Sequence, residues 1–189
     1  MKQAVCYLES IVGSPYSQSR YHALPKQPKE GPDDYERRTW REKAHYDAEG
    51  MAYVPAMSLK NAVAEAAAMM SLRIPGRGTA TYTKHFLAGV QCFDNVPLGV
   101  HRDKVQGLWL HVNADGKRGG GKRVMRCFPV FERWAGTVTF LVVDSQITTE
   151  VFEQVLSQAG GLVGIGRFRP AKGGINGRFR VAKVKWADA

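Results

Sequence analysis

The sequence predicts a single α+β domain with the element order βαββαβ, the ferredoxin-like arrangement in which two helices cover one face of an antiparallel sheet. Three observations predict it. Segments rich in β-branched and aromatic residues stand at both ends of the chain. Two segments between them have apolar residues at helical spacing. The length suits one domain over residues 1–189, and we find no internal repeat and no second core.

The first strand is expected over residues 3–12, where strand-forming residues continue up to the turn Gly13-Ser14-Pro15. Residues 16–50 then become rich in Pro, Lys, Arg, Glu and Asp and poor in aliphatic side chains. This change predicts a large insertion on the surface. Within it, residues 33–48 combine mixed charge with good helix formers, so we expect a short exposed helix there. The alternative is an arm that contacts a neighbouring subunit or a strand lying between subunits, which Tyr35 and Trp40 favour because such rings are costly to leave in water.

The first core helix is expected to follow an N-cap at Ser58. After it, apolar residues recur at i, i+3 and i+4 spacing and are expected to share one helix face; they are Leu59, Ala62, Val63, Ala66, Met69 and Met70. Small alanine side chains on that face favour close packing against a sheet. A stretch rich in Pro and Gly ends this helix.

Strands are expected next. Residues 86–93 predict one, and residues 137–143 predict a buried one from their β-branched content. Between them, residues 108–112 and 124–130 flank a loop of Gly, Lys and Arg. This pattern predicts a hairpin with a basic tip over residues 105–131.

The second core helix is expected to begin near Thr148, with Glu150 in its positively polarised first turn. Two consecutive glycines are expected to end it. A glycine-rich loop over residues 160–178 follows, and the last strand is expected over residues 178–186.

The charge balance limits the class of partner. Lys and Arg number 27 against 17 Asp and Glu, a net charge of +10, which favours polyanions. Cys6, Cys92 and Cys127 form neither a disulfide framework nor the spacing of a zinc site. No apolar run reaches the roughly 18 residues of a membrane helix. We therefore expect a cytoplasmic protein with no membrane segment, no metal and no cofactor.

The glycine-rich loop contains the most distinctive local pattern. Five glycines within residues 164–177 let the backbone approach a ligand closely. The same segment carries the triplet Arg167-Phe168-Arg169 and Lys172, and Arg178 follows it. Arginine forms charge-assisted hydrogen bonds with phosphate, so we favour a phosphate cradle. The alternative is a long connection whose arginines only interact with water.

Two further basic segments predict contacts with a phosphate backbone. Gly116 to Lys122 nearly forms a Walker A motif, but Arg123 stands where Ser or Thr must ligate Mg²⁺, so nucleotide hydrolysis is not expected. Lys117, Arg118, Lys122 and Arg123 favour a mobile finger along a nucleic-acid strand, with a solvated tip as the open alternative.

The second of these segments, residues 73–85, combines basic, hydroxyl and aromatic side chains, which single-stranded nucleic acid needs for phosphate contacts and base stacking. Arg77 and Tyr82 are its candidates for these roles. Tyr82, Lys84 and His85 could also act as base, charge stabiliser and acid in metal-free RNA cleavage. A polar loop whose histidine has no special role is the simpler interpretation.

Two motifs carry a resemblance to a known family. Tyr53-Val-Pro-Ala-Met-Ser-Leu-Lys-Asn-Ala62 is similar to the I-P-x-S-S-L-K-G-A start of the first helix in backbone subunits of CRISPR effector complexes. Those subunits belong to the RAMP superfamily, whose second mark is a glycine-rich loop before the last strand. The resemblance implies an RRM-type fold, with the helix start (Ser58, Lys60 and Asn61) and the loop along a guide RNA and the basic hairpin as a thumb. We therefore expect this chain to be a RAMP-like relative carried by a phage or another mobile element.

The leading hypothesis is a non-enzymatic protein that binds single-stranded nucleic acid, RNA first and single-stranded DNA second, as a homo-oligomer or filament along the strand. One alternative is a metal-independent endoribonuclease of the kind that processes CRISPR RNA. Another is a protein-interaction module, such as a phage-borne inhibitor that docks on an acidic partner. The candidate nucleic-acid-binding residues are Ser58, Lys60, Asn61, Arg77, Tyr82, Lys84, Lys117, Arg118, Lys122, Arg123, Arg167, Phe168, Arg169, Lys172 and Arg178.

Overall fold

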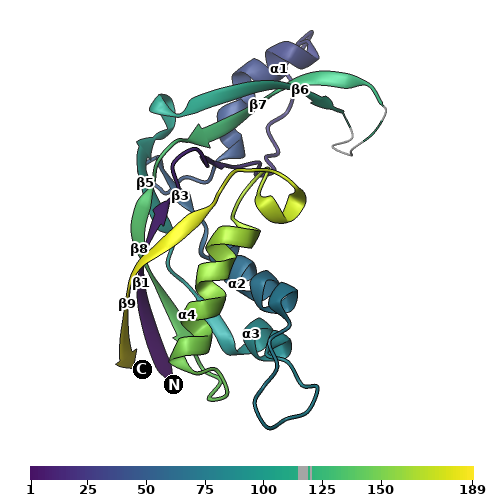
Figure 1. Ribbon diagram of the computed structural model, residues 1–189. Coiled ribbons are helices and arrows are strands. Elements are labelled where there is room, and N and C mark those ends of the chain that lie inside the picture. Colours follow the sequence, from purple (N-terminus) through teal and green to yellow (C-terminus); the bar gives the residue numbers. More distant parts are fainter. Residues whose placement is uncertain (115–118, 120) are drawn as a thin grey trace.

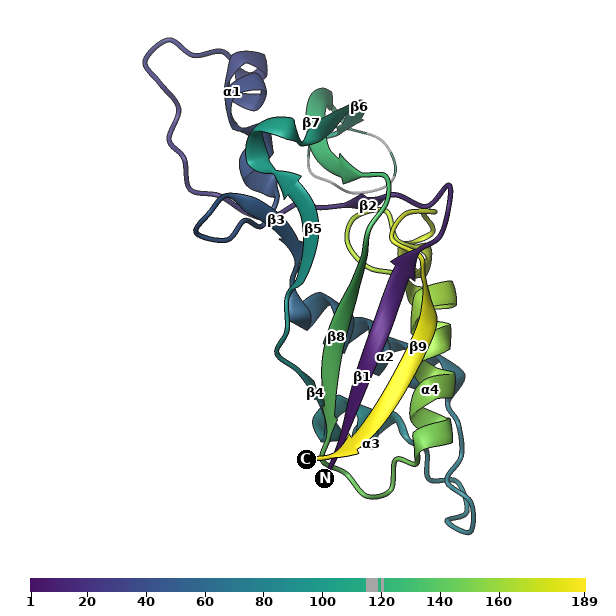
Figure 2. The ribbon, with the colours of Figure 1, turned by 90° about the vertical axis from the view of Figure 1, so that its left-hand side faces the viewer.

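Alternation of buried and exposed side chains builds the main sheet. The structure, a computed structural model, describes residues 1–114, 119 and 121–189. Along the first strand, Ala4, Cys6 and Leu8 are buried while Tyr7 between them is exposed on the opposite face. The sheet is antiparallel, with the order β4-β8-β1-β9 (Figure 2). Its strands are β1 (Lys2–Ser10), β4 (Val90–Cys92), β8 (Ala135–Val142) and β9 (Phe179–Asp188).

Three helices cover one face of this sheet (Figures 1 and 2). In α2 (Ala56–Met70), Leu59, Ala62, Val63 and Ala66 of the predicted face are buried, which confirms this helix. The prediction was wrong for Met69, which is 55 % exposed in the last turn. In α4 (Thr149–Gln158) the hydroxyl of Thr148 accepts a hydrogen bond from the Val151 amide, an N-cap that starts the helix where the sequence predicts it. The third helix is α3 (Thr83–Gly89).

Two adjacent glycines do not end the second core helix, contrary to the prediction. A π-helical turn, Ala159–Val163, continues α4. At Gly160 an added Cβ would lie 2.1 Å from the carbonyl oxygen of Phe179, so the glycine is required for close approach to β9. The prediction treated this glycine as a stop signal, whereas the fold uses it as a packing residue.

The strand expected over residues 86–93 is a further correction. Helix α3 occupies the first half of it, residues 86–89, and only the short strand β4 follows. Tyr82, Phe86 and Gly89 are buried, a spacing of four and three residues that places them on one helix face. The Phe86 ring stacks on Phe152 of α4, with ring centroids 6.4 Å apart. Packing against α4 therefore decides between two structures that the short apolar run allows.

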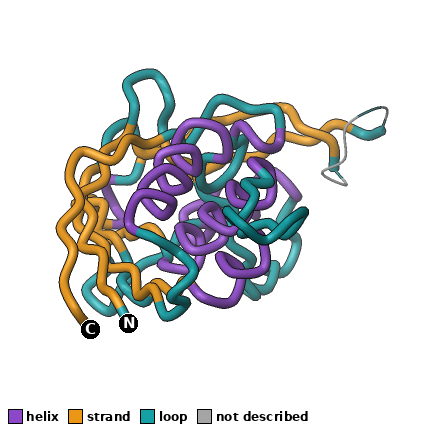
Figure 3. Tube along the Cα trace, turned by 60° about the horizontal axis from the view of Figure 1, so that its bottom comes forward, coloured by secondary structure: helices purple, strands orange, loops and turns teal. Residues whose placement is uncertain are grey.

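A hairpin extends from the top of the main sheet (Figure 1). Strands β6 (Gln106–Asn113) and β7 (Arg123–Phe131) pair antiparallel, and β2 (Tyr16–Ser17) adds a short strand beside β7. Figure 3 shows this hairpin reaching past the helices to the grey residues. It occupies the segment predicted as a hairpin, but Lys117 and Arg118 of the expected basic tip lie outside the described residues.

The segment 16–50 differs from a purely surface insertion. Its helix α1 (Pro32–Thr39) and the 3-10 turn Trp40–Lys43 pack against β7. Trp40 is buried, and an added Cβ at Gly107 of β6 would lie 3.0 Å from its ring. A two-stranded sheet of β3 (Met51–Val54) and β5 (Val96–His101) then joins the hairpin to the main sheet. Separate helices and antiparallel sheets confirm the predicted α+β class.

Aromatic side chains dominate the core between sheet and helices. Phe152 of α4 contacts Phe140 of β8 and Trp186 of β9, with ring centroids 5.5 Å and 5.4 Å apart. No helix in the described part of the chain has the length and apolar character needed to cross a membrane.

Candidate nucleic-acid interface

A cleft of about 430 Å³ opens where the glycine-rich loop, the start of α2 and the segment after β2 meet. We call it the first cleft. Its walls come from segments that lie far apart in the sequence. The lining residues are Tyr16, Gln18, Ser19, Arg20, His45, Ser58, Gly166 and Arg167.

Ser58 reaches the first cleft from the first turn of α2. The helix begins at Ala56, before the predicted N-cap at Ser58, because Pro55 supplies the extended N-cap backbone, with a φ of −63°. The side chain of Asn95 completes the cap, since its Oδ1 accepts a hydrogen bond from the Ala56 amide at 3.0 Å. The first turn contains no acidic residue, so its partial positive charge is not neutralised within the helix.

Arg167 is held in the first cleft by aromatic rings. Its guanidinium carbon lies 3.7 Å from the ring centroid of Phe128 and 4.5 Å from that of Phe168. Burial lowers the pKa of Arg167, but a guanidinium remains charged at neutral pH. Among the described residues no carboxylate pairs with it, and its Nε atom is buried without a hydrogen-bond partner. The side chain therefore presents an uncompensated positive charge.

Phe168 supports this arginine from within the loop. Its backbone has a positive φ of 58°, and its ring packs edge-on against Phe128 with centroids 6.0 Å apart. The loop itself is fixed to β2, because the Arg167 amide donates to the carbonyl oxygen of Ser17 at 2.8 Å. At Gly166, φ is 75° and an added Cβ would lie 2.3 Å from the same carbonyl oxygen.

The other basic residues of the loop have different surroundings. Arg169 is neutralised by Glu65 of α2, with 2.8 Å between Nη2 and Oε2. Lys172 and Arg178 are exposed near the end of the loop. The Ser14 hydroxyl accepts a hydrogen bond from the Arg178 amide at 2.9 Å, which fixes the loop to the end of β1.

A second cleft of about 380 Å³ adjoins the first, and Ser19 and Arg20 line both. We call it the second cleft. It lies between the insertion and the hairpin. Besides the shared pair, the lining residues are Tyr21, His22, Tyr35, Glu36, Lys43 and Arg126.

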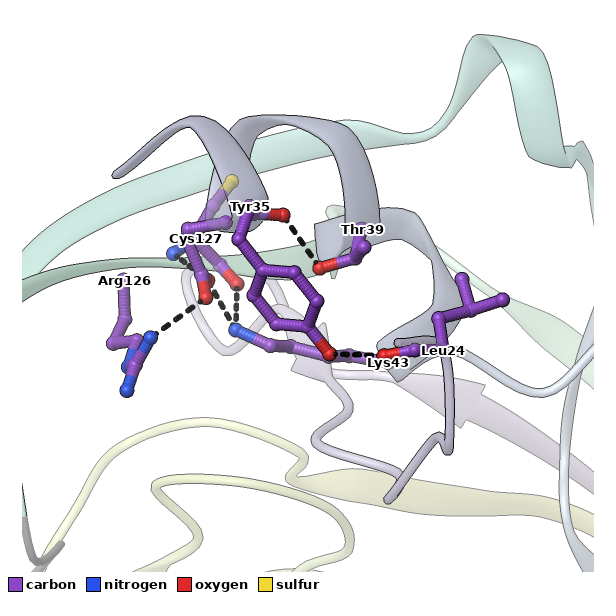
Figure 4. A network of polar contacts seen from close by, with 7 residues as sticks. Leu24, Tyr35, Thr39, Lys43, Arg126 and Cys127 are labelled. Carbon is purple, nitrogen blue, oxygen red and sulfur yellow. Dashed lines mark hydrogen bonds and ion pairs between the residues drawn. The ribbon is translucent and has the colours of Figure 1, made fainter. Parts of the chain in front are cut away.

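The buried carboxylate of Glu36 organises the second cleft. It accepts hydrogen bonds from the Cys127 amide at 2.8 Å, from Arg126 at 3.1 Å and from Lys43. Lys43 also donates to the carbonyl oxygen of Cys127 at 3.0 Å (Figure 4). Burial lowers the pKa of Lys43, and the hydrogen bond that Lys43 donates to Glu36 opposes this effect. Two cations thus share one carboxylate, which leaves this group positive.

Sequence reasoning did not include Arg20, His45 or Arg126 among the site residues. The first two belong to the segment predicted as a surface insertion, and Arg126 lies in a strand. A local signal existed in the run Arg20-Tyr21-His22, where an aromatic residue stands between two basic ones. Nothing in the sequence indicates that this run meets the glycine-rich loop.

Other predicted site residues lie elsewhere. The loop between α2 and α3, with Arg77, stands at the end of the molecule opposite the hairpin (Figure 1). Tyr82 is 5 % exposed and packs against Phe86, so its ring is not available to bases in this conformation. His85 Nδ1 lies 2.7 Å from Asp144 Oδ2, which connects α3 to the segment before α4.

The remaining predicted residues are dispersed. Lys60 extends from α2 toward α3, where its ammonium donates to the carbonyl oxygen of Leu87 at 3.0 Å. Asn61 and Lys84 are exposed, and so are Lys122 and Arg123 at the start of β7. The structure therefore brings Ser58 and Arg167 together in the lining of the first cleft, and the Phe168 ring contacts Arg167. Arg77, Tyr82 and Lys84 are not among the lining residues.

No family model and no curated protein matches the sequence. Among solved structures, the fold is similar to a chain in the cryo-EM structure of the Type III-B Cmr-beta bound to cognate target RNA. The TM-score is 0.55 at 10% sequence identity, and the match covers 99% of this chain and 61% of that chain. A chain of a CRISPR RNA-guided surveillance complex matches with a TM-score of 0.37 at 12% identity, over 94% of this chain and 66% of that one.

This chain thus spans about three fifths of the length of the Cmr-beta chain that it resembles. The likeness is one of fold. At the level of fold, it agrees with the resemblance to CRISPR effector subunits that the helix start and the glycine-rich loop predict.

Proposed function

We propose that the chain is a non-enzymatic subunit of a nucleic-acid-bound complex and holds a single strand, RNA first and single-stranded DNA second, along the first and second clefts. The charge of these clefts carries the proposal. Among the described residues, four cationic side chains and one carboxylate line them. A strand of phosphates neutralises such a surplus and releases its counterions. The cations are Arg20, Lys43, Arg126 and Arg167.

The topology supports a ferredoxin-like core beneath these clefts. Helix α2 connects β1 to β4, and α4 connects β8 to β9. Strand β8 lies between β1 and β4, so the first βαβ unit is split. In this assignment the insertion and the hairpin are arms added to the core, and the clefts lie where these arms meet the glycine-rich loop.

An aromatic side chain stands beside the cationic ones. Tyr21 is 85 % exposed and lines the second cleft next to Arg20. Stacking of a base on such a ring stabilises the complex by about 1–3 kcal/mol, whichever base it is. We therefore expect binding that depends strongly on salt and weakly on sequence.

The binding test is a fluorescence-polarisation titration with labelled single-stranded RNA over a series of salt concentrations. Arg20→Ala and Arg167→Ala should each reduce the slope of log affinity against log salt by about one, since each removes one phosphate contact. Lys183→Ala is the matched control, because Lys183 is exposed opposite Tyr7 on the outer face of the sheet. Absence of binding to any oligonucleotide at low salt would contradict the proposal.

We also propose that several copies bind along one strand as a homo-oligomer. Contacts to phosphate carry no sequence information, so one copy leaves equivalent sites for the next. Light scattering with RNAs of increasing length should then give complexes whose mass rises in steps. One copy bound at every length would overturn this part.

The non-enzymatic part is tested with the same RNA in EDTA. We expect the RNA to remain intact, with the contact between His85 and Asp144 serving to hold α3 in place. Specific cleavage that His85→Ala abolishes would instead favour a metal-independent endoribonuclease.

A further inference from the structure

His45 stands in the wall of the first cleft in a fixed hydrogen-bonding state. Its neighbour Gln18 is 3 % exposed, and the Gln18 Nε2 atom donates to the carbonyl oxygen of Tyr53 at 2.7 Å. Gln18 Oε1 accepts from the His45 backbone amide at 2.6 Å. A carbonyl only accepts and an amide N–H only donates, so these two contacts leave one orientation for the Gln18 side chain.

This orientation determines the tautomer of His45. The ring atom Nδ1 lies 2.9 Å from Gln18 Oε1, which is an acceptor, so Nδ1 carries the hydrogen. Burial, followed by the positive charge of Arg20, lowers the pKa of His45 from its usual value of 6.5, so the ring is neutral at pH 7. Nε2 therefore has a free lone pair, and among the described residues it has no hydrogen-bond partner.

His45 Nε2 is a hydrogen-bond acceptor in a cleft whose charged side chains are donors. Arg20 and Arg167, which line the same cleft, are donors suited to phosphate oxygens. Phosphate oxygens cannot donate, so Nε2 cannot form a hydrogen bond with the phosphate itself. In a nucleic-acid backbone the group next to each phosphate is the sugar, and the ribose 2′-hydroxyl is a donor that deoxyribose lacks.

We propose that His45 Nε2 accepts a hydrogen bond from a ribose 2′-hydroxyl, and that this contact makes the first cleft select RNA over DNA. The inference rests on the proposed function, since it needs a strand in the first cleft. It assigns the choice of sugar to one atom, whereas the cationic side chains bind either backbone.

The test compares the affinity of the full chain for RNA, DNA and 2′-O-methyl RNA of one sequence. We expect RNA to bind about fivefold more tightly than the other two strands, which corresponds to the net free energy of one hydrogen bond. The 2′-O-methyl strand keeps the bases and replaces the donor hydrogen with a methyl group, so it separates the hydroxyl from a base N–H as the source of the bond. Full affinity for 2′-O-methyl RNA would overturn the assignment.

Two variants test the residue. His45→Asn keeps a side-chain donor for Gln18 and removes the atom at the Nε2 position, while His45→Phe keeps a ring beside Tyr53. In both, the affinity ratio of RNA to DNA should fall to about one, and circular dichroism checks that each variant is folded. A preserved ratio in a folded variant, or a wild-type preference for DNA, would overturn the inference alone. Absence of binding to all strands would overturn the proposed function and the inference with it.

Discussion

At the scale of single residues, the shape of the second cleft depends on Glu36. Its side chain joins α1 to β7 by bonding two cations and a backbone amide, and the residue is 2 % exposed. Replacing a buried carboxylate that accepts this many hydrogen bonds lowers the stability of the fold, because its partners would remain buried without an anion.

We predict that Glu36→Gln lowers the free energy of unfolding by about 2 kcal/mol. This is less than the loss of a fully buried ion pair, because Arg126 is partly exposed. The midpoint of urea denaturation measures the change. Glu132→Gln, at an exposed position after β7, is the control and should leave the midpoint unchanged. Equal midpoints for the two variants would show that the Glu36 network does not stabilise the fold.

At the scale of elements, local patterns predict some segments better than others. Helix α2 is predicted from the helical spacing of its apolar residues, and the hairpin of β6 and β7 from the two strand-like segments beside the basic loop. Strand β5 was missed because Pro97 and Gly99 interrupt it, although Val96 and Leu98 alternate with them and are buried. Antiparallel pairing with β3 stabilises the extended backbone of β5, which the sequence of β5 alone does not predict.

The glycine-rich loop allows a prediction at this scale. Gly166→Ala should weaken binding of single-stranded RNA several-fold, because a Cβ there would collide with Ser17 and the Tyr16 ring and displace Arg167. Gly161→Ala is the matched control, since no atom lies within 4 Å of its added Cβ. Fluorescence polarisation compares the two variants. If Gly166→Ala binds like the control, the position of the loop over β2 does not matter for binding.

At the scale of the whole molecule, the sequence indicates which segments are basic but not which charges remain unpaired. Arg169 resembles Arg167 in its local sequence, yet Glu65 neutralises the former and aromatic rings hold the latter. The loop carrying Arg77 also contains glycine and arginine, but it lies at the far end of the molecule. Such pairings depend on contacts between distant parts of the chain, which spacing in one sequence does not reveal.

The central claim is that one strand occupies both clefts. Hydrogen–deuterium exchange with and without a single-stranded RNA tests it most directly. We predict slower exchange in residues 16–22 and 164–169 when RNA is bound, with no change in residues 71–82. Protection of residues 71–82, with unchanged exchange in the two cleft segments, would contradict it.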